Sequence, residues 1–393
     1  MTATSRSGIP PAGRSFARSL RCFRCGQEVP FDPTAYLCPS CGAGEAPEDP
    51  GILEVDYDYP SAGAALREAI ETDLGRGVFR YQALLPAVDD GQGLPAGDTP
   101  LQSAPRLTNR LAAGRILLKD ETRNPTRCLK DRASAVCVAM AQAAGSTDVY
   151  CASAGNAAIS LAGFSAQRGI PCHVFVPGHT SRERLKWLEY FGADVVVSAG
   201  NYDQAFEEAE SEGRRQGWYS RNCAFNPFLV EGKKTVAFEI AEQLGWDVPD
   251  VVIAPVGDAC TLAAIGKGFR ELHQLEFIGA VPQLIGVQAE TMQPMVRRFQ
   301  DRVGADSGET AAASINVRRP RNALRLLKEL QYAGGEMVAV PDEAIAAAHD
   351  ALAKEAGVVV EFTSAAVLAG FELLAHDYRD ATVVMVLTGG RVD

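Results

Sequence analysis

The 393-residue sequence is poor in histidine, in net positive charge and in long apolar runs. It has five histidines, and none lies in a spacing typical of a metal site or a catalytic triad. With 38 basic and 49 acidic residues the net charge is −11, which argues against a general binder of nucleic acids or membrane surfaces. No apolar stretch reaches the length that a bilayer-spanning helix needs, and no secretory signal is visible. The chain is long enough for two or more domains, and we expect it in the cytoplasm.

The ten cysteines fall into two groups. Six occur singly in segments that look buried, which is typical of a reducing compartment. The others form two Cys-x-x-Cys pairs separated by twelve residues, and a glycine follows each pair: Cys22, Cys25, Cys38 and Cys41. This spacing is typical of a zinc ribbon, and because four thiolates leave no open coordination position we predict a structural zinc site. A redox or disulfide pair is the alternative.

The stretch before the first cysteine, residues 1–21, contains four arginines and no acidic residue, and it is rich in Ser, Ala, Gly and Pro. Such a composition predicts a flexible leader. An organelle transit peptide has a similar composition, but this stretch lacks a clear amphipathic period. We therefore predict a leader over 1–21, followed by the ribbon over 22–58.

Lys130 stands at the start of a segment rich in small residues, Ala133 to Ala144, which predicts a helix packed on all sides. Apolar surroundings disfavour the charged form of an amine and lower its pKa. A neutral lysine amine is a nucleophile that can form a Schiff base with a cofactor aldehyde. The alternative is a solvated lysine at a helix start, and the segments that follow in the chain argue against it.

Three further segments place a turn or a hydroxyl directly after a strand-like run: Ser153 to Ala157, Gly257 to Thr261, and Thr388. A strand, a tight turn and a helix N-terminus point several N–H groups at one spot, which suits a phosphate. Each turn alone is a weak signal, because glycine after a strand is common in αβ loops. The ordered set that they form with Lys130 is a stronger signal.

The order of these four motifs resembles the fold-type II pyridoxal-phosphate enzymes, and within them most closely the threonine synthases. Five shorter segments resemble the same family and extend the likeness from about residue 20 to the end of the chain: 51–59, 97–101, 117–121, 191–193 and 231–235. One type of threonine synthase also carries a similar ribbon. The resemblance implies an α/β fold similar to tryptophan synthase β, with two α/β domains of mostly parallel sheets and an N-terminal zinc ribbon.

The resemblance also implies a role for each motif. Lys130 would hold pyridoxal 5'-phosphate as a Schiff base, and Asn156 would hydrogen-bond the ring hydroxyl of this cofactor. Thr388 would face the pyridine nitrogen, where a hydroxyl leaves the ring neutral and favours elimination and replacement over transamination. The cofactor phosphate would lie on the amides of Gly257, Asp258, Ala259, Cys260 and Thr261. The α-carboxylate of the substrate would lie on the backbone of Ser153, Ala154, Gly155, Asn156 and Ala157.

Several positions depart from the family pattern. Leu229 stands where the family normally has an arginine that grips the substrate's phosphate. A phosphate dianion in a desolvated pocket needs a cation, so O-phosphohomoserine is a doubtful substrate unless Arg127 supplies that charge. An arginine that points into solvent is an equally good interpretation of Arg127. The remaining departures are Arg127, Cys128 and Leu129 in place of Gly, Ser and Phe, Ala154 in place of Thr, and Ala259 in place of a common Gly.

Short apolar strands alternate with helices beyond Lys130, as in an α/β layer with a mostly parallel sheet. We place a small inserted domain at 131–230 and a larger cofactor-binding domain at 59–130 and 231–393. We expect a homodimer.

Together these patterns predict a pyridoxal-phosphate-dependent lyase or synthase that acts at Cβ or Cγ of a small amino acid. Conversion of O-phosphohomoserine to threonine is one candidate reaction. A serine or threonine dehydratase and a β-replacement synthase that uses an O-activated serine are the alternatives. A non-catalytic relative with a partner-binding ribbon is an alternative of another class, and Lys130, Asn156 and Thr388 argue against it. We expect neither nucleic acid nor membrane as a partner.

Overall fold

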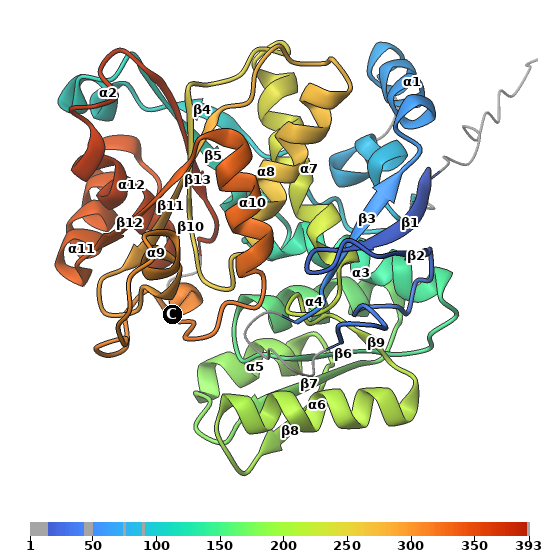
Figure 1. The fold of residues 1–393 in the computed structure, drawn as a ribbon. Coiled ribbons are helices and arrows are strands. Elements are labelled where there is room, and N and C mark those ends of the chain that lie inside the picture. Colours follow the sequence, from blue (N-terminus) through green and yellow to red (C-terminus); the bar gives the residue numbers. More distant parts are fainter. Residues whose placement is uncertain (1–14, 43–49, 74–75, 89–90, 391–393) are drawn as a thin grey trace, which may run out of the picture.

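The computed structural model describes residues 15–42, 50–73, 76–88 and 91–390, and their strands form three sheets (Figure 1). Among these residues, no helix combines the length and the apolar character needed to cross a bilayer.

The N-terminal sheet is antiparallel and consists of β1 (Ala17–Cys22), β2 (Glu28–Pro30) and β3 (Leu53–Tyr57), with β1 in the middle. Leu20 of β1 is fully buried and pairs with both neighbouring strands. The prediction of a flexible leader over 1–21 is therefore wrong for its last residues, because ladder hydrogen bonds and burial order the chain from Ala17 onward. Residues 1–14 of the predicted leader lie outside the described residues.

The largest sheet has the strand order β12-β11-β10-β13-β5-β4, and every neighbouring pair except β4–β5 is parallel. Its central strands are buried along nearly their whole length, as in parallel sheets covered on both faces. The strands are β4 (Leu101–Ser103), β5 (Arg115–Asp120), β10 (Val251–Pro255), β11 (Gln283–Ala289), β12 (Glu336–Val340) and β13 (Thr382–Leu387).

Helices cover both faces of this sheet (Figure 1). One face packs against α7 (Phe228–Gln243), α8 (Cys260–Gln274) and α10 (Ala323–Ala333). The other face packs against α2 (Pro105–Leu111), α11 (Asp342–Ala351) and α12 (Phe362–Leu374). The remaining helical segments of this part are α1 (Tyr59–Glu71), α9 (Pro294–Phe299), the 3₁₀ segments Gly77–Leu84, Glu121–Arg123 and Ala313–Ile315, and the π-helical turn Leu352–Ala356.

The third sheet is fully parallel and has the order β8-β7-β6-β9. Helix α3 packs against α4 and α7 and so joins this layer to the large sheet. Two α/β layers with mostly parallel strands confirm the predicted fold class. The elements are α3 (Lys130–Ala143), β6 (Val149–Ala152), α4 (Asn156–Arg168), β7 (Cys172–Pro177), α5 (Arg182–Tyr190), β8 (Asp194–Ser198), α6 (Tyr202–Gln216) and β9 (Tyr219–Ser220).

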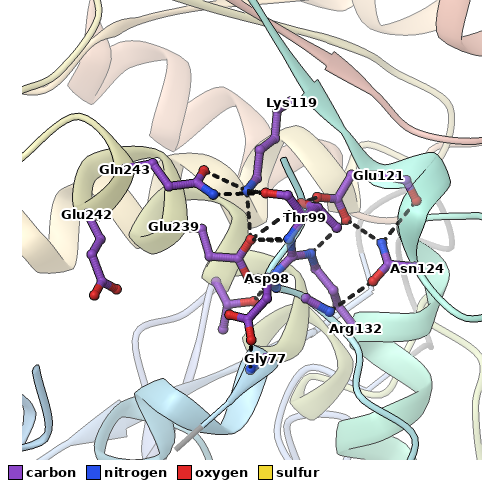
Figure 2. A network of polar contacts seen from close by, with 12 residues as sticks. Gly77, Asp98, Thr99, Lys119, Glu121, Asn124, Arg132, Glu239, Glu242 and Gln243 are labelled. Atoms are coloured by element: carbon purple, nitrogen blue, oxygen red, sulfur yellow. Dashed lines mark hydrogen bonds and ion pairs between the residues drawn. The ribbon is translucent and has the colours of Figure 1, made fainter. Parts of the chain in front are cut away.

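A buried network of charged side chains fixes the start of α3 (Figure 2). The Arg132 guanidinium contacts Glu239 of α7 at 2.6 Å and Glu121 at 2.7 Å. The Lys119 ammonium of β5 contacts the other oxygen of Glu239 at 2.7 Å. These side chains are at most 3% exposed. Because Arg132 lies two residues after Lys130, the network ties the position of Lys130 to β5 and α7.

Candidate active site

A cavity lies where four helices begin, beside the ends of β10 and β13. Lys130, Asn156 and Cys260 are the first residues of α3, α4 and α8, and Glu361 is the N-cap of α12. Helix N-termini carry unpaired N–H groups and partial positive charge, so this arrangement suits anionic ligand groups. The cavity is lined by Lys130, Asn156, Pro255, Val256, Gly257, Asp258, Ala259, Cys260, Thr261, Ser314, Ile315, Val317, Glu361, Thr363 and Thr388.

The amine of Lys130 lies in surroundings that favour its neutral form. Burial lowers the pKa of Lys130, and the positive charge of Lys233 lowers it further. A neutral amine carries the lone pair that a nucleophile or a general base needs. The lowered pKa that the sequence predicted for the Lys130 amine therefore agrees with its surroundings in the structure.

The turn between β10 and α8 is held in one shape from both sides. A side chain at Gly257 would place its Cβ 2.5 Å from the carbonyl oxygen of Ser314, so only glycine fits there. The Asp258 carboxylate accepts hydrogen bonds from the backbone N–H of Arg321 at 2.8 Å and from the Asn322 amide at 2.9 Å. This turn, which leads into the N-terminus of a 15-residue helix, is suited to hold a phosphate.

Two polar side chains complete the predicted set. The Asn156 amide donates to Glu361 at 2.8 Å, which links the start of α4 to the start of α12. The carbonyl of Thr388 accepts from the backbone N–H of Leu129 at 2.9 Å, so the end of β13 lies directly beside the residue before Lys130. The Thr388 hydroxyl lies 3.3 Å from the hydroxyl of Ser364.

Some predicted residues lie elsewhere. Arg127 is exposed and does not line the cavity, so the structure does not bring its guanidinium to the predicted substrate site. Leu229 is fully buried in the core and also stays outside the lining. Of the turn before α4, only Asn156 lines the cavity; Ser153, Ala154, Gly155 and Ala157 flank it and are partly exposed.

Seven lining residues were not predicted as site residues from the sequence, namely Pro255, Val256, Ser314, Ile315, Val317, Glu361 and Thr363. The first two lie at the end of β10, and the other five lie on the segment around Ala313–Ile315 and at the start of α12. The segment around Ala313–Ile315 and the start of α12 carry neither a glycine turn nor a recognisable motif. The only sequence signal for Glu361 was its position before a helix, and this signal is weak because glutamate is not a preferred N-cap and the Glu361 side chain makes no cap hydrogen bond.

A family model described as pyridoxal-phosphate dependent enzyme matches residues 93–389. The chain belongs to this family. It is 36% identical to threonine synthase of Methanocaldococcus jannaschii over 379 residues, which covers 94% of this chain and 91% of the relative. It is also 36% identical to threonine synthase of Mycobacterium tuberculosis over 318 residues, with 79% and 87% covered. The protein is therefore a threonine synthase-like enzyme with a lyase-type reaction.

Solved structures of related enzymes share the fold at lower identity. Threonine deaminase isoform 2 from Solanum lycopersicum has a TM-score of 0.67 and 20% identity, and the match covers 85% of this chain and 90% of the other. A fungal L-serine ammonia-lyase from Rhizomucor miehei has a TM-score of 0.67 and 22% identity, with 76% and 95% covered. These likenesses establish the fold-type II architecture.

The chemistry of the donor set fits pyridoxal phosphate. Lys130 offers an amine for the aldehyde, and the turn from Gly257 to Thr261 offers backbone amides at a helix N-terminus for the phosphate. Asn156 and Thr388 offer an amide and a hydroxyl on the same cavity.

The four predicted metal ligands come together beside the N-terminal sheet, at the end of β1 and in the turns that follow. The sulfurs of Cys22, Cys25, Cys38 and Cys41 all lie within 4.8 Å of one another, and those of Cys25 and Cys38 are 3.8 Å apart. Zinc–sulfur bonds of about 2.3 Å in tetrahedral geometry place the sulfurs about 3.8 Å apart. The donor set and its dimensions are compatible with a zinc ion.

Proposed function

We propose that the protein catalyses elimination or replacement at Cβ or Cγ of a small amino acid. The observation that carries this proposal is the single cavity onto which Lys130, Asn156, the turn Gly257 to Thr261 and Thr388 all open. A threonine hydroxyl, rather than a carboxylate, at the position predicted for the pyridine nitrogen favours elimination and replacement over transamination.

Each residue has a role in this reaction. Pyridoxal phosphate, when bound, supplies the aldehyde that holds the amino acid and the ring that takes up electrons from Cα. The Lys130 amine, neutral because burial lowers its pKa, removes the Cα proton and later returns it or passes it to the leaving group. The N-terminus of α4 beside Asn156 receives the α-carboxylate of the substrate, and the turn before α8 holds the cofactor phosphate.

The charges on the cavity support a leaving group that is not a phosphate. Among the described lining residues Lys130 has the only basic side chain, and its amine is held neutral, while Asp258 and Glu361 are carboxylates. The cofactor phosphate occupies the turn before α8, so a second phosphate on the substrate would find no charged side chain on the lining. A hydrogen bond to a charged partner is typically worth about 1.5–3 kcal/mol. We therefore place hydroxy and O-acyl amino acids ahead of O-phosphohomoserine, the substrate considered from the family resemblance.

A substrate screen tests this proposal. The cofactor-loaded enzyme is incubated with serine, threonine, O-acetylserine, O-acetylhomoserine and O-phosphohomoserine, and products are identified by mass. We expect at least one substrate without phosphate to be turned over with a kcat/KM at least about tenfold above that of O-phosphohomoserine, as the missing contact implies. Lys130→Ala is the control and should form no product. Efficient formation of threonine from O-phosphohomoserine would overturn the choice of leaving group.

Three further features belong to the same proposal. The four clustered cysteines, Cys22, Cys25, Cys38 and Cys41, hold a structural zinc ion, because a closed shell of four thiolates leaves no position for a substrate. The enzyme acts as a homodimer and works in the cytoplasm. The reason for that location is the six single cysteines outside the ribbon, which are free thiols in the structure.

A further inference from the structure

Two cysteines and two cationic side chains lie in contact beside the cavity. The Lys233 ammonium is 2.9 Å from the sulfur of Cys260 and 3.2 Å from the sulfur of Cys223. The Arg221 guanidinium is 3.2 Å from the same Cys223 sulfur. We call Arg221, Cys223, Lys233 and Cys260 the thiol cluster. Of these four residues, Cys260 also lines the cavity together with Lys130, so the cluster adjoins the cavity through Cys260.

The backbones that carry the two cysteines are fixed to each other by one side chain. The Asn322 amide donates to the carbonyl of Cys223 at 3.1 Å and to the carboxylate of Asp258 at 2.9 Å. Asp258 lies two residues before Cys260 in the same turn. Asn322 is 1% exposed, and it therefore holds the segment before α7 and the turn before α8 in a constant relation.

The two cations need a negative partner that the surrounding residues do not otherwise supply. Arg221 is 3% exposed and Lys233 is fully buried. The other contacts of Arg221 are the Ser134 hydroxyl and the carbonyl of Lys130, and the described residues place no carboxylate at hydrogen-bond or ion-pair distance from either cation. A buried cation without an anionic partner is strongly destabilising. A thiolate on Cys223, which contacts both cations, supplies the missing charge.

The electrostatics of the cluster agree with a thiolate at this position. The hydrogen bond from Cys260 and then the charge of Lys233 lower the pKa of Cys223 well below its usual value, although burial opposes them. The same interaction raises the pKa of Cys260, so Cys260 remains the protonated partner.

Three buried cysteines outside the cluster have a raised rather than a lowered pKa. Burial raises the pKa of Cys137, Cys151 and Cys172 above the usual value for a thiol. All three are at most 5% exposed, whereas Cys223 is partly exposed. Reactive cysteines are those that combine thiolate character with access, and Cys223 has both.

We propose that Cys223 and Cys260 form a modification site that reacts with hydroperoxides and closes to a disulfide in the cavity wall. The Cys223 sulfur attacks one peroxide oxygen, the O–O bond breaks, and the departing hydroxide or alkoxide takes up a proton. The product is a sulfenic acid on Cys223. The Cys260 sulfur then attacks the Cys223 sulfur, the S–S bond forms, the S–O bond breaks, and the released hydroxide takes the Cys260 proton to form water. The peroxide is reduced by two electrons, and the two thiols are oxidised.

Closure would change the charge next to the catalytic amine. The negative charge of the Cys223 thiolate raises the pKa of Lys130 and partly offsets the effect of Lys233. The disulfide carries no charge, so it leaves Lys233 and Arg221 without their partner and lowers the pKa of Lys130 further. Oxidation by a peroxide would thus change the pKa of the catalytic amine of Lys130.

Peptide mass spectrometry tests the proposal on the full-length, cofactor-loaded protein. One equivalent of hydrogen peroxide is added at neutral pH, free thiols are alkylated, and each cysteine peptide is quantified. We expect a linked pair of peptides that contain Cys223 and Cys260, with a mass two hydrogens below the sum of the free thiol peptides and reversed by a dithiol. Cys137, Cys151 and Cys172 are internal controls in the same sample and should react at least about tenfold more slowly.

Two variants separate the steps. In Cys260→Ser the sulfenic acid should accumulate on Cys223 and be trapped by dimedone, while in Cys223→Ser neither peptide should be modified. Lys233→Met should slow the reaction of Cys223 about tenfold or more, because it removes the charge that favours the thiolate. Oxidation of Cys223 at the same rate as the buried controls, or no linked peptide in the unmodified protein, would overturn the proposal. Because the readout is mass, it is independent of the substrate screen.

Discussion

Arg127 and Ala259 adopt the same left-handed backbone conformation, each with a φ of +65°. Arg127 lies in the turn before α3, and Ala259 is the N-cap of α8. The family pattern has glycine at both positions. The chain has therefore kept the shape of both turns although it lost the residue that adopts this conformation without strain.

Ala259→Gly and Arg127→Gly should each stabilise the protein by about 0.5–1 kcal/mol, because the left-handed conformation costs an L-residue about 1–2 kcal/mol and the greater freedom of unfolded glycine offsets only part of it. The midpoint of urea unfolding measures the change. Ala139→Gly, inside α3, is the matched control and should cost about 1 kcal/mol or more. A loss of stability in Ala259→Gly as large as in this control would show that its backbone is not strained.

Arg132→Met should destabilise the protein by about 3–5 kcal/mol at neutral pH, because it leaves the carboxylates of Glu121 and Glu239 buried with too few partners. Arg123→Met is the control, since Arg123 is 69% exposed and its ion pair with Asp120 should be worth no more than about 1 kcal/mol. Urea unfolding of both variants distinguishes them. Equal, small losses of unfolding free energy in the two variants would mean that the network in Figure 2 contributes no more to stability than a surface ion pair.

The same network predicts a dependence on pH. Burial alone would raise the pKa of Glu239, but the charges of Arg132 and Lys119 lower it below its usual value. A carboxyl group whose pKa is lower in the folded state stabilises the fold above its unfolded pKa, about 4.3, and this contribution is lost as the pH falls. The difference in stability between the wild type and Arg132→Met should therefore narrow below about pH 4. A difference that widens in acid would contradict the assigned sign.

About one zinc ion per chain should be found by elemental analysis, as expected for one closed site of four thiolates. Cys38→Ser should lose this zinc and lower the thermal stability, while the visible absorption of the bound cofactor remains. Ser40→Ala, an exposed change two residues further on, is the control and should keep both. Loss of the cofactor absorption in Cys38→Ser without loss of stability would place the metal in the active site instead.

The cavity could be predicted to a large extent because its motifs sit where parallel strands end and helices begin. Lys130, Asn156, the turn before α8 and Thr388 follow this pattern, and such ends meet at one edge of a sheet. Glu361 could not be found in this way, since its role depends on contact with Asn156 across more than two hundred residues of sequence.

The direction in which a side chain points could not be predicted from the spacing of residues in the sequence. Arg127 lies three residues before Lys130, yet its left-handed backbone sends it to the surface. Thr99, Lys119 and Glu121 belong to shorter motifs that resemble the family. They form part of the buried charge network and do not line the cavity. Strand β1 was also missed, because it is only six residues long and two of them are exposed arginines.

Borohydride reduction of the cofactor-loaded protein, followed by peptide mapping, tests most directly whether Lys130 is the residue that binds the cofactor. Reduction should fix one pyridoxyl group per chain on the peptide that contains Lys130, and Lys130→Ala should carry none and have no activity. Lys233→Met should still be labelled at Lys130, although the charge of Lys233 lowers the pKa of that amine. A label on another lysine, or no label after reconstitution with pyridoxal phosphate, would contradict the assignment of this cavity as the active site.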